Sequence, residues 1–178
     1  AQMPQLQRDV VAYLRNGNVL VHVEEEEQLR IFDALKQQTI QILDEPMEWQ
    51  QAIHKASEPL LHRAIIKKSY VQAMIDLLYD YGPYIVLANG VAIAHANPEQ
   101  GANALGLSLL INKQSITFED DANVHFLFVL SNPDQDKHLH LLRDIMRLAN
   151  DTALVDQLLK MDDTLAVLEG LKKLSNMQ

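Results

Sequence analysis

The chain of 178 residues contains no cysteine, which excludes disulfide frameworks, thiolate metal sites and cysteine nucleophiles. No apolar run approaches the roughly 18 to 20 residues of a membrane span, so we expect no membrane insertion. Residues 1–9 lack the apolar core of a secretory signal. A basic stripe is missing too, and the net charge is −9, so we expect no direct contact with nucleic acid. Together these absences favour a cytoplasmic protein.

The composition and the order of the predicted segments indicate a globular α/β protein. Apolar residues make up 48% of the chain and charged residues 22%, which is typical of a protein with a substantial core. Strand-like segments interleave with helical ones, which predicts a mixed sheet covered by helices. Helices are predicted over residues 5–15, 24–38, 48–57, 70–79, 137–149, 151–160 and 162–173, and strands over 19–23, 84–87, 91–94, 104–111 and 124–130.

Local sequence signals divide the chain and mark helix starts. The sequence Asp-Glu-Pro at residues 44–46 breaks the chain. We therefore expect residues 1–41 to be an N-terminal extension or the tail of a preceding domain, and residues 42–178 to be the main domain. Ser69, Asp151 and one of the aspartates at 162–163 stand where a side chain caps a helix N-terminus.

Two of the seven histidines stand where sheet proteins place functional groups. His95 ends the apolar run at 91–94 and precedes a Pro/Gly loop, so we expect its imidazole at the sheet rim with one nitrogen facing solvent. His138 opens a helix after a strand and a turn, where the helix dipole favours an anion. A second imidazole there would donate a hydrogen bond to a phosphoryl group on the first. Spacing alone also leaves open two unrelated surface histidines.

The remaining histidines lack such a context. We expect structural roles for four of them and a solvent-facing position for His140, which points away from His138 on the same helix. The pair His138 and His140 lacks further ligands at metal-binding spacing, so no metal site is expected. Glycine-rich phosphate loops and serine nucleophile motifs are missing as well, and no cofactor is expected. The four structural histidines are His22, His54, His62 and His125.

Several blocks of sequence resemble one family, in the same order along the chain. These blocks are Tyr-Val-Gln-Ala-Met at 70–74, Gly-Pro-Tyr-Ile-Val at 82–86, Gly-Val-Ala-Ile-Ala-His-Ala at 90–96 and His-Leu-His-Leu-Leu at 138–142. They resemble the enzyme IIA components of the sugar phosphotransferase system, mannitol/fructose superfamily, and most of all its ascorbate-type branch. The likeness spans about residues 42–172. It implies a mixed, mostly parallel sheet of about five strands with helices on both sides.

The resemblance also implies a phosphotransferase activity. His95 would accept a phosphoryl group from phospho-HPr and pass it to an enzyme IIB domain, while His138 would stabilise that group. An alternative is the C-terminal IIA-like domain of a transcription regulator, in which phosphorylation of the same histidine is a signal. A binding module that keeps the fold without the chemistry is a third possibility. The sugar and any homo-oligomeric state are left open.

Overall fold

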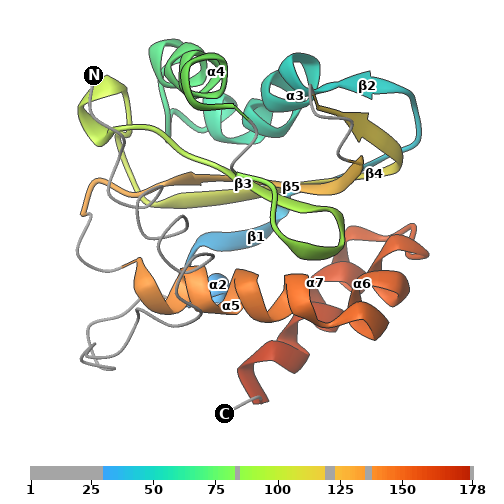
Figure 1. The fold of residues 1–178 in the computed structure, drawn as a ribbon. Coiled ribbons are helices and arrows are strands. Elements are labelled where there is room, and N and C mark those ends of the chain that lie inside the picture. The colour runs from blue at the N-terminus through green and yellow to red at the C-terminus, as the bar shows by residue number, and fades with distance from the viewer. Residues whose placement is uncertain (1–29, 83–84, 119–122, 135–137, 177–178) are drawn as a thin grey trace.

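The computed structural model describes residues 30–82, 85–118, 123–134 and 138–176. A single sheet forms the middle layer, with helices on both of its faces (Figure 1). The helix predicted over residues 5–15 and the strand predicted over 19–23 lie outside the described residues.

Five strands form the sheet, and most of their pairings are parallel. The strand order is β1-β4-β5-β3, and the short β2 pairs with β4 beside β1. The pairs β1–β4, β2–β4 and β3–β5 are parallel, whereas β4–β5 is antiparallel. The predicted mixed, mostly parallel sheet is therefore confirmed. The strands are β1 (Leu35–Leu43), β2 (Met47–Glu48), β3 (Val91–Ala94), β4 (Gly106–Thr117) and β5 (Asn123–Ser131).

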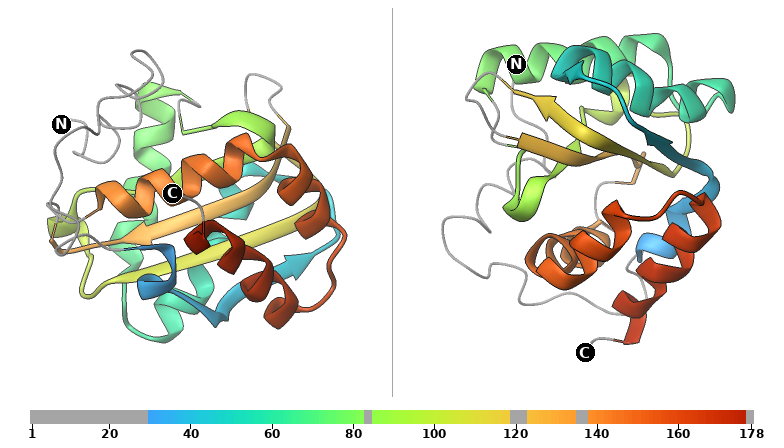
Figure 2. Two further views of the ribbon diagram at one scale, coloured as in Figure 1. Left: turned by 90° about the horizontal axis from the view of Figure 1, so that it is seen from below. Right: turned by 90° about the vertical axis from the view of Figure 1, so that its right-hand side faces the viewer.

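Each face of the sheet has its own helices and its own buried cluster (Figures 1 and 2). In β3, Ile93 packs on the α5 side while Ala92 and Ala94 pack on the side of α3 and α4. This alternation of side chains is the ordinary result of strand geometry. One face carries α3 (Trp49–His62) and α4 (Lys68–Tyr81); the other carries α2 (Ile31–Ala34), α5 (Leu139–Asn150), α6 (Thr152–Leu159) and α7 (Thr164–Leu171), followed by a 3-10 turn at Lys172–Asn176.

The first strand replaces the end of a predicted helix. Only Ile31–Ala34 is helical within the described part of the segment 24–38, and Leu35–Leu43 forms β1. The prediction failed because pairing with β4 outweighs the helical periodicity of this segment. β1 runs across the boundary expected at residues 41/42. The division of the chain into an extension and a domain stays a prediction.

Two smaller expectations are also wrong. Of the strand predicted over 84–87, the described residues 85–87 contribute only a bridge between Val86 and Ala92. Ser69 is not an N-cap, because α4 begins at Lys68 with Lys67 in the capping position. The Ser69 hydroxyl instead donates to the Gln100 carbonyl, 2.6 Å away, in the loop that follows His95.

The three C-terminal helices agree with their predicted ranges. Asp151 accepts from the Leu154 amide at the start of α6, and Asp163 accepts from the Leu165 amide at the start of α7, so both predicted caps are confirmed. Within the described ranges, no helix combines the length and apolar character that a membrane crossing requires.

Candidate functional site

A tight turn delivers the chain into β3 and so to His95. Asn89 and Gly90 both have positive φ angles, 55° and 74°. Asparagine and glycine are the residues that adopt this conformation most readily. A Cβ at Gly90 would also lie 3.1 Å from the Asn123 carbonyl oxygen at the start of β5. The turn therefore depends on this short sequence, and the buried strand Val91–Ala94 follows it directly.

The Tyr70 hydroxyl holds the chain in place just beyond His95. It donates to the Leu130 carbonyl of β5, 2.7 Å away, and accepts from the Ala96 amide at 3.1 Å. Tyr70 is fully buried and comes from α4, and burial raises the pKa of its hydroxyl. The Tyr70 side chain thus fixes the carboxyl end of β3 to that of β5. His95 directly precedes Ala96, one of the two residues that Tyr70 bonds.

His95 is buried, not at a solvent-facing rim. Its side chain is 3% exposed, so the prediction that one nitrogen faces solvent is wrong. The histidine follows β3 between the helical layers, whereas the sequence gives no measure of what covers a strand end. Burial lowers the pKa of His95 from 6.5 to about 3, and repulsion from His138 adds to this shift. The imidazole is therefore neutral at physiological pH.

His138 lies at the start of α5 and within electrostatic range of His95. His138 is the N-cap residue of this helix and is 4% exposed. The two histidines singled out from the sequence are thus brought to the same end of the sheet from positions 43 residues apart in sequence (138 − 95). Their roles in phosphoryl transfer stay predictions.

The other described histidines are dispersed. His54 and His62 on α3 are exposed, and the His125 ring nitrogen Nδ1 lies 2.9 Å from the Asn112 carbonyl in the sheet. His140 is 9% exposed, so its predicted solvent-facing position is wrong. It lies in the first turn of α5, which packs on the sheet and has little outward surface there.

Asn132 is a polar residue at this end of the sheet that the sequence alone did not single out. It follows β5 directly and is 4% exposed. Its Oδ1 accepts a hydrogen bond from the Asp134 amide at 3.0 Å, as expected of an asparagine that starts a turn. The signal in the sequence was an amide residue directly after an apolar strand, but its burial could not be foreseen.

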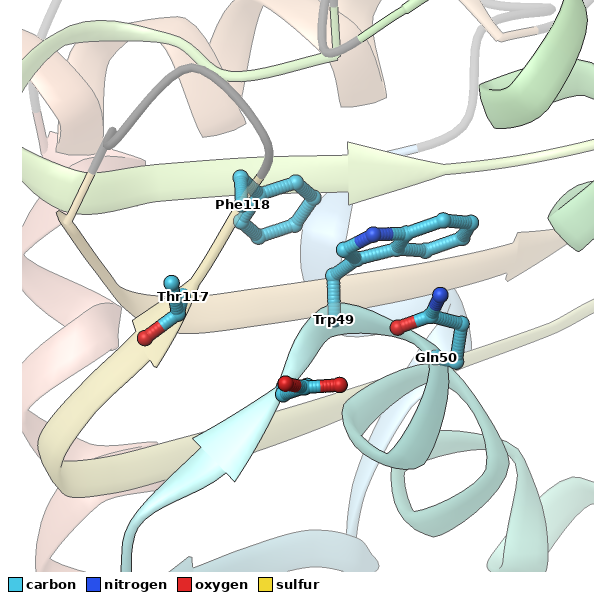
Figure 3. Close-up of a pocket in the computed structure, with 5 residues that line it drawn as sticks. Trp49, Gln50, Thr117 and Phe118 are labelled. Atoms are coloured by element: carbon cyan, nitrogen blue, oxygen red, sulfur yellow. The ribbon is translucent and has the colours of Figure 1, made fainter.

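A surface pocket occurs at the opposite edge of the sheet. Thr117 pairs with Asn123 at the start of β5, whereas Ala94 pairs with Val129 near its end. At about 3.3 Å per residue, the six-residue offset is roughly 20 Å. Figure 3 shows the indole of Trp49 beside the ring of Phe118 in this pocket. Among the residues that the structure describes, no three acidic or histidine side chains are grouped to hold a metal ion.

Residues 33–174 match the family described as phosphoenolpyruvate-dependent sugar phosphotransferase system, EIIA 2. The chain belongs to this family. A mannitol-specific cryptic phosphotransferase enzyme IIA component of Escherichia coli (strain K12) is 33% identical over 132 residues, covering 74% of this chain and 90% of that relative. An ascorbate-specific EIIA component of Salmonella choleraesuis (strain SC-B67) is 30% identical over 134 residues, covering 73% and 87%.

Solved structures of EIIA proteins have the same fold. The solution structure of the mannitol-specific cryptic enzyme IIA from Escherichia coli superposes with a TM-score of 0.70 at 30% identity, over 82% of this chain and 99% of that one. The enzyme IIA of a mannitol IIA–phosphorylated IIB complex from the same species superposes with a TM-score of 0.68 at 19% identity, over 78% and 97%. The second likeness shows the fold alone. Membership in the EIIA family is consistent with the predicted sheet flanked by helices.

Proposed function

We propose that this EIIA protein is a phosphoryl carrier in which His95 accepts a phosphoryl group from phospho-HPr and passes it to an enzyme IIB domain. The observation that carries the proposal is the buried imidazole of His95 at the end of β3, with His138 at the start of α5 beside it. Such a carrier would work in the cytoplasm, where sugar phosphotransferase components exchange phosphate.

The state of His95 suits a nucleophile. A pKa of about 3 leaves the ring neutral at pH 7, so a nitrogen lone pair is available to attack phosphorus. The N–P bond of phospho-HPr breaks as the new N–P bond forms, and the departing imidazole keeps the electron pair of the broken bond. The transfer needs an in-line approach of the two imidazoles and stabilisation of the phosphoryl oxygens.

His138 supports the second requirement. It stands at the positive end of a 12-residue helix, where a bound anion is favoured. An imidazole N–H there would donate to a phosphoryl oxygen on His95. The phosphoryl group brings negative charge next to the neutral imidazole of His95, and the positive end of α5 would attract that charge.

Burial of His95 sets a condition on both transfers. Because the side chain is 3% exposed, the groups packed around it must move when a partner protein docks. A neighbouring fold was solved as a complex of enzyme IIA with phosphorylated enzyme IIB, which supports an enzyme IIB domain as the acceptor here. Mannitol and ascorbate are the sugars named for its relatives, so enzyme IIB domains of both types are the acceptors to test.

The test is phosphorylation in a reconstituted system. The protein is incubated with phosphoenolpyruvate, enzyme I and HPr, and phosphate is detected by intact mass and acid lability. We expect one acid-labile phosphoryl group on the wild type, none on His95→Ala, and an unchanged level on the matched control His54→Ala, whose side chain is exposed. A wild type that never gains phosphate would refute the proposal.

Addition of enzyme IIB then separates carrier from regulator. Loss of phosphate from His95 with gain on the IIB domain supports a carrier. Retention of phosphate with every IIB domain tested supports the alternative, a IIA-like regulatory domain in which the phosphohistidine is itself the signal. Retention would remove the acceptor step from the proposal while leaving His95 as the phosphorylated residue.

A further inference from the structure

Asn132 carries a buried hydrogen-bond donor for which the described residues provide no acceptor. Its Oδ1 accepts from the Asp134 amide at 3.0 Å, and an N–H can only donate, so this bond fixes which end of the side-chain amide is oxygen. The other end, Nδ2, is buried and has no hydrogen-bond partner among the described residues. Leaving such a donor unsatisfied costs about 1–3 kcal/mol, so it calls for a ligand or another explanation.

Strand pairing brings Asn132 to the same end of the sheet as His95. β3 and β5 are parallel, with Ala94 opposite Val129. Beyond these residues, the Tyr70 hydroxyl bonds both strands, through the Ala96 amide and the Leu130 carbonyl. His95 and Asn132 therefore both follow carboxyl ends that are fixed to each other.

Alternation along the strands places both residues on the α5 side. Ile93 and Leu130 pack in the buried cluster beneath α5. His95 is two residues after Ile93, and Asn132 is two residues after Leu130, so both continue that face. The same face carries His138 at the start of α5, which contributes to the lowered pKa of His95. The unused amide donor, the two histidines and the positive helix end thus lie together.

We propose that the Nδ2 group of Asn132 donates a hydrogen bond to an oxygen of the phosphoryl group carried on His95. This inference rests on the proposed function, and it adds a third residue to the site. Phosphoryl oxygens are acceptors, and the amide Nδ2 is a donor at any pH, so the bond would form in the transition state and persist in the phosphohistidine. Donors aimed at developing oxyanions typically contribute about 10²- to 10³-fold to a rate.

The sharpest variant is Asn132→Asp. It keeps the oxygen that accepts from the Asp134 amide and exchanges only the donor for an oxygen that repels the phosphoryl group. We expect the rate of transfer from phospho-HPr to fall at least about 100-fold, by the magnitude found for removal of such donors. Asn132→Leu, which removes the donor without adding charge, should lower the rate by about 100-fold, and Asn132→Asp should lower it further.

A matched control comes from another buried asparagine. Asn112 on β4 is fully buried, and both ends of its amide are bonded to the Glu45 backbone, at 3.2 Å and 2.7 Å. Asn112→Leu should lose stability to urea but keep the rate of transfer in the folded protein. Asn132→Asp also buries a carboxylate and should lose stability, so its rate is measured, like that of Asn112→Leu, under conditions in which circular dichroism shows the protein folded. There the rate should be lost in Asn132→Asp and kept in Asn112→Leu.

A second readout does not depend on transfer rates. The side-chain amide protons of Asn132, assigned in ¹⁵N-labelled protein by their absence in Asn132→Leu, should move downfield when His95 is phosphorylated. An unchanged resonance together with a wild-type rate in Asn132→Asp would overturn the inference while the wild type still gains phosphate. A wild type that gains no phosphate would refute the proposed function, and this inference with it.

Discussion

The two edges of the sheet differ in what they bury and in what they leave open. Where β3 and β5 end, polar groups are enclosed: His95, His138 and Asn132 are each 3–4% exposed. At the opposite edge, Trp49 and Phe118 border a pocket that is open to solvent. The site proposed for phosphoryl transfer is therefore not this surface pocket. It is the end of the sheet where polar groups are removed from water, because desolvation changes their pKa and hydrogen-bonding behaviour.

The largest expected effect is a loss of stability caused by a substitution at the aromatic edge, the end of the sheet that carries Trp49 and Phe118. Trp49 is 4% exposed and contacts the rings of Tyr79 and Phe118, with centroid separations of 5.1 Å and 6.4 Å. Trp49→Ala should lower the free energy of unfolding by about 3–5 kcal/mol, through lost burial and the cavity left behind. Urea unfolding followed by circular dichroism measures this, because the substitution removes the only tryptophan.

The same variant tests whether the edges are independent. At a temperature where Trp49→Ala remains folded, phosphorylation of His95 should proceed at the wild-type rate, since roughly 20 Å of β5 separates the two edges. A slower rate in the folded variant would show that the aromatic edge supports the histidine site, and the comparison would fail.

The second prediction concerns the tyrosine at the histidine edge. Tyr70→Phe removes the hydroxyl that bonds the Ala96 amide and the Leu130 carbonyl, so both buried groups lose this partner. We expect the free energy of unfolding to fall by about 1–3 kcal/mol. Trp49 fluorescence during urea unfolding measures the change. The rate of phosphorylation should fall as well, because the residue after His95 loses its anchor.

Tyr79→Phe is the matched control for this substitution. The Tyr79 side chain is largely exposed, and its hydroxyl accepts a hydrogen bond from the side-chain amide of Gln50, at 3.1 Å. Its removal should change stability by no more than about 0.5 kcal/mol. Equal losses for the two tyrosines would contradict the role assigned to Tyr70 at the strand ends.

The sequence allowed much of the β3–β5 region to be predicted and little of the first strand. Residues 91–94 and 124–130 are apolar and bounded by turn residues, so their strands were visible locally. β1 has the sequence Leu-Lys-Gln-Gln-Thr-Ile-Gln-Ile-Leu with no clean alternation, and only its pairing with β4 makes it a strand. Local pattern cannot report a pairing partner some 70 residues away.

The candidate site divides in the same way. His95 and His138 could be named because each stands at a recognisable boundary between elements and within a family-like block. Three features could not be predicted, because each depends on residues distant in sequence. They are the burial of His95, the bridging hydroxyl of Tyr70 and the unused donor of Asn132. Side-chain environment is a tertiary property, so the sequence could name the two candidate histidines but not their burial or their electrostatics.

The third prediction uses the pKa of His95. The folded-state pKa is about 3, below the 6.5 of an ordinary histidine, so the unfolded chain binds a proton that the folded protein excludes. The contribution of this group is therefore zero above about pH 7 and becomes destabilising as the pH falls. Between about pH 6.5 and pH 3 it should lower the free energy of unfolding by about 1.4 kcal/mol per pH unit.

His95→Gln isolates this contribution from that of the carboxylates. The difference in stability between wild type and variant should shift by about 2 kcal/mol between pH 7 and pH 5, to the disadvantage of the wild type. Urea unfolding at several pH values measures it. A difference that stays constant with pH would mean that His95 titrates normally, and that this edge of the sheet is hydrated.

The smallest expected effect leaves stability unchanged and tests access directly. Diethyl pyrocarbonate acylates neutral imidazoles that it can reach, and peptide mapping by mass spectrometry gives a rate for each histidine. At pH 7, His54 and His62 on α3 are exposed and should react quickly, whereas His95 should react at least about 10-fold more slowly because it is 3% exposed. In urea all three should react alike, which controls for intrinsic reactivity.

If His95 reacted as fast as His54 in the folded protein, the strand ends would open readily in solution. A docking partner would then not need to move the groups around the imidazole, and the contrast between an enclosed and an open edge would no longer hold.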